Sequence, residues 1–244
     1  ELADKWILSR LEKTRAGVTK NLERFELGEA ARLMYEFIWS EFCDYYIELT
    51  KSRLYGSDAD KKSTALFVLS TVLEKALRLL HPFMPFLTEV IRQKLPNAAG
   101  SIMVAKWVEP GEIYEAAEIQ MNSLIEVVKT VRNLKSELGI DSRKKVKVVL
   151  RTERKDILQE NVNCIGELAF AEPIIFSDEK PSHAMSGVIE GVEIYLPLEG
   201  LIDAEKEIAR LTKELEKVRK GAATTAGKLN NERFLSKAPA EVVQ

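Results

Sequence analysis

Apolar residues in the first part of the chain, residues 1–95, recur at steps of three and four, the spacing of one face of an α-helix. The pattern predicts four helices, one from about Trp6 and the others over about 27–54, over 60–80 and up to 94. Gly56 and the segment 57–60 are typical of a helix stop followed by a helix cap. Pro82 and Pro85 end the third helix. The apolar stripe of the second helix is wide, so we predict an antiparallel bundle that buries this helix on more than one side.

The pattern changes after Pro110, where Gly111 breaks the chain. A helical stripe from Tyr114 to Leu138 is followed by the segment 145–150, which alternates charged and branched apolar residues as a half-buried strand does. The remaining elements expected are a helix over about 154–169, a strand at 174–176 and a hairpin over 185–198 that turns at Gly191. Together they predict a small α/β unit of three or four strands, mostly antiparallel, with two helices.

A coiled-coil seam is the signature of the last segment. Its apolar residues step by three and four in turn, at Leu201, Ala204, Ile208, Leu211, Leu215 and Val218. Gly221 and Gly227 weaken the far end, because glycine costs about 1 kcal/mol in a helix interior. Asn230 and Asn231 are expected to turn the chain, and Pro239 to begin a returning helix. That helix cannot be completed by Gln244, so we expect a truncated hairpin.

The predicted fold class is therefore mainly α. An antiparallel helical bundle is followed by a small α/β unit and a coiled-coil helical arm. The expected domains are 1–110 for the bundle, 111–200 for the α/β unit and 201–244 for the arm.

The composition excludes several classes of protein but identifies no reaction. The formal net charge is -2, so any surface that binds nucleic acid must be local. We expect no signal peptide and no membrane span, since no apolar run approaches roughly 20 residues. Cys43 and Cys164 are too few and too far apart for a disulfide framework or a zinc site, which favours a cytoplasmic location. Phosphate-binding loops, nucleophile elbows and paired histidine ligands are absent from the sequence, so we predict no catalytic, cofactor-binding or metal-binding residue in this chain.

Four aromatic residues of the second helix offer two interpretations. They could stack on nucleotide bases, but their helical spacing favours packing in the core. The residues are Trp39, Phe42, Tyr45 and Tyr46.

Three stretches carry a resemblance to a known family. Residues 35–51, YEFIWSEFCDYYIELTK, resemble the second helix of the anticodon-binding domain in valyl-tRNA synthetases. Residues 79–91, LLHPFMPFLTEVI, resemble a segment shared by the valyl, isoleucyl and leucyl enzymes. The discriminating stretch is 197–203, PLEGLID, followed by the heptads and by KLNNERFLSKAPAEVV at 228–243, an order that resembles the C-terminal arm of valyl-tRNA synthetases.

The resemblance implies a fragment that binds tRNA(Val) while another part of the enzyme performs ATP-dependent and Mg²⁺-dependent aminoacylation. The family's catalytic and editing motifs do not occur in these 244 residues. The helix that opens the family's bundle is also expected to precede Glu1. The full-length enzyme is expected to be a monomer, whereas the fragment is expected to self-associate through its uncovered seam.

Basic residues are the candidates for contacts with a polyanion, because tRNA binding rests largely on phosphate contacts. The resemblance places the arm at the outer corner of the tRNA, where we expect contacts from Lys213, Lys217, Arg219, Lys220 and Lys228. On the anticodon side the candidates are Arg10, Lys13, Lys20, Arg24, Lys51 and Arg53.

Three alternatives remain open at this point. One is a self-associating coiled-coil scaffold that binds no RNA, which salt-dependent binding to bulk tRNA would distinguish. Another is a fragment of an isoleucyl or leucyl enzyme. The third is an independent enzyme.

Overall fold

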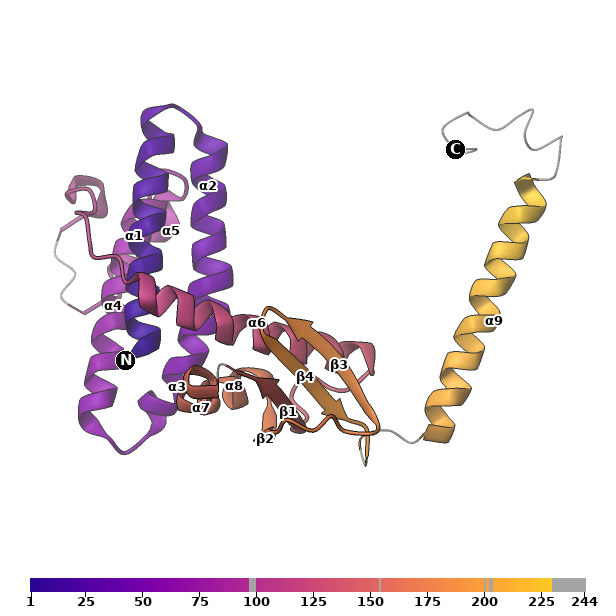
Figure 1. Ribbon diagram of the computed structural model, residues 1–244. Helices are drawn as coiled ribbons and strands as arrows, with labels where there is room; N and C mark the ends of the chain where they lie inside the picture. Colours follow the sequence, from indigo (N-terminus) through magenta and orange to yellow (C-terminus); the bar gives the residue numbers. More distant parts are fainter. Residues whose placement is uncertain (97–99, 154, 200, 202–203, 230–244) are drawn as a thin grey trace. The chain divides into compact units, whose positions relative to one another are not determined.

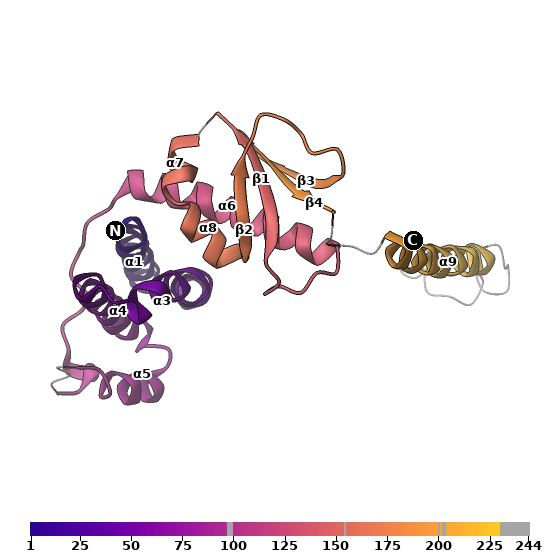
Figure 2. The same ribbon diagram turned by 90° about the horizontal axis from the view of Figure 1, so that it is seen from below.

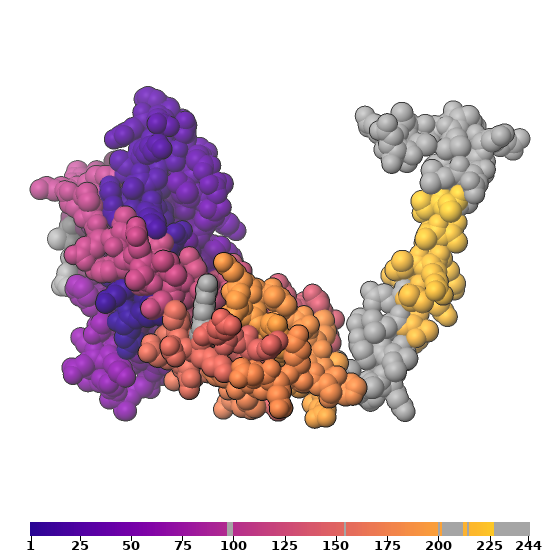
Figure 3. All heavy atoms as spheres, viewed as in Figure 1, coloured from indigo at the N-terminus to yellow at the C-terminus, as the bar shows by residue number. Residues whose placement is uncertain are grey.

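The chain divides into two compact units, Glu1–Leu196 and Pro197–Gln244. The computed structural model describes residues 1–96, 100–153, 155–199, 201 and 204–229 (Figure 1). In the first unit a helical bundle adjoins a small sheet and its helices as one continuous body (Figure 3). The predicted fold class, mainly α with a small α/β unit, is confirmed. The predicted boundary between residues 110 and 111 stays a prediction.

The bundle is an up-and-down arrangement of helices, and an irregular segment leads out of it (Figure 1). Its helices are α1 (Leu2–Glu23), α2 (Leu27–Glu36), η1 (Phe37–Ile47), α3 (Glu48–Tyr55), α4 (Ala59–Leu80) and α5 (Pro85–Arg92). Asp58 caps α4 as expected, because its Oδ1 accepts from the amides of Asp60 at 3.1 Å and Lys61 at 3.0 Å. The segment that leads out of the bundle contains the short 3-10 helix η2 (Ile102–Val104).

The second predicted helix is continuous over α2, η1 and α3, but its middle, η1, is a π-helix. In a π-helix the hydrogen bond joins residues five apart, so residues at that spacing share a face. Phe37 stacks on Phe42 with ring centroids 6.5 Å apart, and Phe42 stacks on Tyr46 at 6.1 Å. The π-helical winding turns Trp39 away from the core. Its side chain is 58% exposed and stacks on Tyr35. The prediction of core packing is thus confirmed for Phe42, Tyr45 and Tyr46 and wrong for Trp39.

A buried ion pair fastens α1 to the helix that follows. Arg53 donates from Nη1 and Nη2 to the two carboxylate oxygens of Asp4, each at 2.8 Å, and the Tyr46 hydroxyl donates to Asp4 Oδ1 at 2.6 Å. Burial by itself raises the pKa of Asp4, but the bonds from Arg53 and Tyr46 outweigh it and hold the pKa below its ordinary value of 3.8. The carboxylate is therefore charged, buried and paired.

A long helix connects the bundle to the sheet. Helix α6 (Glu115–Glu137) contacts α1 near its start, and it contacts α8 and β3 further along (Figure 2). One helix was expected over about 154–169, but α7 (Lys155–Glu160) and α8 (Val162–Ala169) occur, with Asn161 between them in a non-helical conformation. Residue 154 lies outside the described residues.

The sheet has four strands in the order β2-β1-β4-β3. They are β1 (Val146–Thr152), β2 (Ala171–Phe176), β3 (Ala184–Ile189) and β4 (Val192–Pro197). Strand β1 pairs with β4 antiparallel and with β2 parallel, and α7 and α8 form the crossover between β1 and β2. The predicted hairpin turns at Gly191, whose φ of 75° is a conformation that favours glycine.

The second unit contains helix α9 (Ala204–Leu229). Side chains are described for only part of it, so the seam residues Ala204, Ile208 and Leu211 lie outside the described side chains, and the predicted returning helix lies outside the described residues. Leu215 and Val218 are exposed. Across the described part of the chain, every helix is too short or too polar to cross a membrane.

Replacing Arg53 with Met should leave the Asp4 carboxylate buried without its cation, which costs about 3–5 kcal/mol of unfolding free energy. The matched control is Lys51→Met on the same helix, whose pair with Glu48 is exposed at both ends and is worth about 0–1 kcal/mol. Urea denaturation measures both values. Equal effects of the two substitutions would show that the buried pair contributes no more to the free energy of unfolding than a surface pair does.

The Asp4 pair also predicts a dependence on pH. The pKa of Asp4 is lowered on folding, so its stabilising contribution is complete above the unfolded-state value of about 3.9 and is lost as the pH falls through the lower folded value. We expect the stability difference between the wild type and Asp4→Asn to be constant from pH 7 to about pH 5. The difference should shrink below about pH 4. A difference that widens in acid contradicts the prediction.

Candidate nucleic-acid interface

Two of the basic residues predicted on α1 are held by carboxylates of the chain itself. Arg10 donates from Nε and Nη2 to Glu41 Oε1 at 2.9 and 2.7 Å, and Lys13 Nζ donates to Glu118 Oε2 at 2.7 Å. The bond to Glu41 raises the pKa of Arg10. A phosphate that approaches either cation must compete with these carboxylates. Arg10 and Lys13 are therefore weaker candidates for phosphate contacts than their sequence positions suggested.

Glu118 is the centre of this cluster. Its side chain is buried on α6, and it also accepts a hydrogen bond from the Ser9 hydroxyl at 2.5 Å. Burial raises the pKa of Glu118, but the bonds from Lys13 and Ser9 more than compensate, so that its pKa lies below the ordinary value. The charged carboxylate thus joins the start of α6 to α1. Arg10 and Lys13 take part in holding the bundle and the sheet unit together.

The other two candidates of α1, Lys20 and Arg24, lie at its C-terminal end and are exposed. Within the part of the chain that the structure describes, no acidic side chain lies within ion-pair distance of either residue. A cation without a partner can give its whole charge to an approaching phosphate. Of the four candidates on α1, Arg10 and Lys13 are therefore paired with carboxylates, whereas Lys20 and Arg24 remain available to a phosphate.

The two candidates on α3 have opposite environments. Lys51 is exposed, and its Nζ contacts both carboxylate oxygens of Glu48, at 2.6 and 2.7 Å. Arg53 is only 7% exposed, and its guanidinium is consumed by Asp4. A phosphate cannot reach Arg53, because its side chain is buried. The expected tRNA contact is therefore corrected: Arg53 holds α3 against α1 through Asp4.

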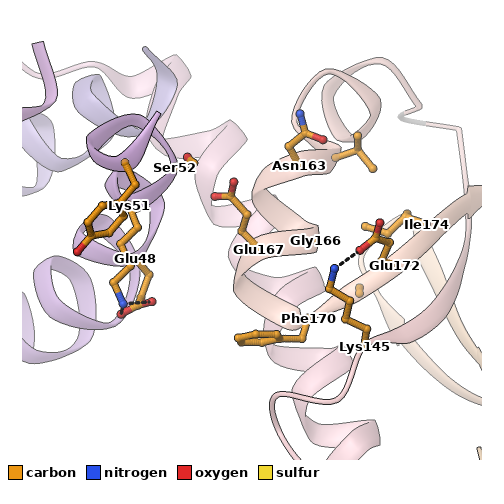
Figure 4. Close-up of a pocket in the computed structure, with 13 residues that line it drawn as sticks. Glu48, Lys51, Ser52, Lys145, Asn163, Gly166, Glu167, Phe170, Glu172 and Ile174 are labelled. Carbon is orange, nitrogen blue, oxygen red and sulfur yellow. Dashed lines mark hydrogen bonds and ion pairs between the residues drawn. The ribbon is translucent and has the colours of Figure 1, made fainter. Parts of the chain in front are cut away.

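A groove lies between α3 and the region of α8 and β2, with a volume of about 730 Å³ (Figure 4). Lys51 and Glu48 lie on the α3 side, and the ion pair of Lys145 with Glu172, 2.5 Å long, lies on the other. Glu167 of α8 points across the groove towards Ser52 (Figure 4). Burial raises the pKa of Glu167, and a hydrogen bond from Ser52 opposes part of that rise.

A buried lysine organises the backbone next to Phe170, which lines the groove. Lys135 of α6 is 1% exposed, and its Nζ donates to the backbone carbonyls of Ser142 at 2.6 Å, Lys144 at 2.7 Å and Ala169 at 3.2 Å. The ammonium also lies 5.7 Å from the ring centroid of Phe170. Burial lowers the pKa of Lys135. One side chain thereby ties the loop before β1 to the turn after α8.

That loop carries basic residues that the sequence reasoning missed. Arg143, Lys144, Lys145 and Lys147 are all exposed, and they occur within five consecutive residues. A run this dense in cations is a recognised signal for a nucleic-acid surface. The alternating pattern of the same segment predicts a strand, which β1 confirms.

On α9 four of the predicted arm residues have exposed side chains. Lys213, Lys217 and Lys220 are spaced by four and three residues, which places them in one row on the helix. Arg219 lies about a third of a turn away from that row. The side chain of Lys228 lies outside the described ones. The structure therefore gathers four cations on one short stretch of α9.

Among the described residues, no three His, Cys, Asp or Glu side chains are grouped so as to hold a metal ion. Cys43 and Cys164 are both free thiols.

Comparison with protein families gives two matches along the chain. Residues 4–150 match the anticodon-binding domain of tRNA ligase. Residues 203–244 match the tRNA binding arm of valyl tRNA synthetase. The two matches occur in the order that the sequence resemblance implied.

Curated relatives extend the similarity over essentially the whole chain. The valine–tRNA ligase of Carboxydothermus hydrogenoformans is 50% identical over 248 residues, that of Listeria monocytogenes 46% over 250 and that of Bacillus subtilis 43% over 251. Each alignment covers 99–100% of this chain but 28% of the relative. The chain thus spans a little over a quarter of the length of these proteins.

Substituting Met for Lys135 should loosen the loop 142–145 and the turn at 169–170 together, because one ammonium serves carbonyls in both. We expect a loss of about 1–3 kcal/mol in stability and faster amide hydrogen exchange in both segments. Lys129→Met is the matched control on the same helix, since Lys129 is half exposed and pairs only with Glu126 there. If exchange rises in one segment alone, Lys135 does not couple the two.

Proposed function

Because the chain belongs to the anticodon-binding domain family of tRNA ligases, we propose that it binds a tRNA and positions it for a catalytic domain carried elsewhere in a longer polypeptide. The observation that carries this proposal is the presence of two tRNA-binding modules in one chain, at residues 4–150 and 203–244. A coiled-coil scaffold that binds no RNA has no reason to combine them. A chain that spans 28% of each relative leaves ample length for catalysis.

The nucleic acid we propose is tRNA(Val), and the reaction of the whole protein is the joining of valine to it with ATP and Mg²⁺. The match at 203–244 favours this over an isoleucyl or leucyl enzyme, since it is to the valyl arm. The relatives at 43–50% identity are named valine–tRNA ligases. This role places the protein in the cytoplasm, where its tRNA is charged. Its oligomeric state stays a prediction.

We assign the phosphate contacts by the charge environment of each cation. A lysine or arginine that binds a phosphate releases counterions only if its charge is not already neutralised. Lys20 and Arg24 meet this condition in the bundle, and Lys51 meets it in part because Glu48 accompanies it. On the arm the assigned residues are Lys213, Lys217, Arg219 and Lys220.

Replacing all four arm cations with Ala should weaken binding of the full 244-residue chain to unfractionated tRNA and flatten its salt dependence. Each phosphate contact that is lost lowers the slope of log affinity against log salt by about 0.7–0.9. Fluorescence anisotropy with labelled tRNA at several salt concentrations measures the slope.

The matched control exchanges Lys for Arg and Arg for Lys at the same four positions, which keeps every positive charge. Its slope should equal that of the wild type. An alanine variant whose slope is also unchanged would show that this part of α9 does not contact phosphates.

A further inference from the structure

The groove between α3 and the region of α8 and β2 has an interior and a rim of different character. Its interior offers hydrogen-bond acceptors and aromatic carbon. The carboxylates of Glu48 and Glu167 line it, and so do the rings of Tyr55 and Phe170, which are 86% and 38% exposed. A phosphate is repelled by such carboxylates, whereas ribose hydroxyls and the amino groups of bases donate to them. A base can also stack on an exposed ring.

The rim is cationic. Lys145 lines the groove, and the exposed side chains of Arg143, Lys144 and Lys147 belong to the same short segment. Lys147 follows Lys145 by two residues and is the second residue of β1. Lys145 is paired with Glu172, but no described carboxylate lies within ion-pair distance of Arg143, Lys144 or Lys147. Three open cations thus flank Lys145 in the chain, and Lys145 itself lines the groove.

The aromatic part of the groove is held in a strained conformation. Phe170 ends α8 with φ 51° and ψ 51°, a left-handed conformation that a bulky residue adopts rarely. Glycine is the usual residue at such a helix end. Backbone strain of this kind persists only where the surroundings enforce it, and it clusters at ligand sites. Lys135 contacts both parts of this turn, since its ammonium bonds to the carbonyl of Ala169 and lies over the ring of Phe170.

The same lysine also bonds to the carbonyls of Ser142 and Lys144, which flank Arg143. The backbone of the cationic loop and the aromatic turn are therefore fixed relative to one another before any ligand arrives. A binding site that is ordered in advance loses less conformational entropy on binding.

We propose that this groove binds an unpaired nucleotide of RNA, with its base against Phe170 and its flanking phosphates on Arg143, Lys144 and Lys147. An acidic peptide fits the rim but is repelled by Glu167, for which no cation lies within ion-pair distance among the described residues, so the interior argues for a nucleotide. The volume of about 730 Å³ lies in the range of small-ligand sites. The proposal rests on the proposed function, because it adds a contact for the same tRNA at a place separate from the α9 cations.

The test uses Phe170→Gly in the full chain, since glycine accepts the left-handed backbone and the fold should be retained or slightly stabilised. Loss of one stacked base should weaken binding to unfractionated tRNA by about 5-fold or more. Thermal denaturation verifies the fold. The chain supplies a matched control in Phe25→Gly, because Phe25 is also left-handed, with φ 59°, and 87% exposed in the turn between α1 and α2. That control should leave tRNA affinity unchanged.

A second variant, Arg143→Ala with Lys144→Ala and Lys147→Ala, should lower the salt slope of tRNA binding by about 0.7–0.9 for each phosphate contact removed. The proposal is overturned if Phe170→Gly and Phe25→Gly bind tRNA equally well while the arm variant loses affinity, and the proposed function then stands. Competition by polyglutamate as strong as by an equally charged oligouridylate assigns the rim to acidic peptides and overturns it as well. A wild-type chain that binds no tRNA overturns both proposals.

Discussion

Helix α6 carries a buried charge near each end, and the arrangement of the first unit depends on how these two charges are satisfied. Glu118 near its start takes hydrogen bonds from Ser9 and Lys13 of α1. Lys135, in the last turn of α6, donates hydrogen bonds to three backbone carbonyls on the sheet side. A buried charge without partners is costly, so each end can dock in only one way. The bundle and the sheet are thereby fixed to one rigid connecting helix.

The same rule separates structural cations from those open to a ligand. Arg10, Lys13 and Arg53 each lie against a carboxylate of their own chain, and their charge is used in holding helices together. Among the described residues no carboxylate lies within ion-pair distance of Lys20 or Arg24, nor of Arg143, Lys144 or Lys147. A net charge of -2 is therefore compatible with binding a polyanion. What matters to a phosphate is the local charge that remains after internal pairing.

The π-helix η1 shows how a small change in backbone winding alters the chemistry of a surface. With α-helical spacing, the aromatic residues of this segment all belong to the core. With the wider π spacing, Phe37, Phe42 and Tyr46 stack inside, and Trp39 turns outwards against Tyr35. Periodicity alone cannot distinguish the two windings, because the choice between them depends on packing against α1.

The sequence by itself determined the element types and the family. Apolar spacing identified the helices and the hairpin at Gly191, and three short stretches identified the two tRNA-binding modules, because these signals are local in the chain. It could not determine which basic residues stay available. The partners of Arg53 and Lys13 lie 49 and 105 residues away, and the groove beside Lys51 is walled by α8 and β2, more than a hundred residues further on. Contacts over such separations leave no periodic trace, so only the tertiary structure decided which charges are consumed inside the fold and which remain at its surface.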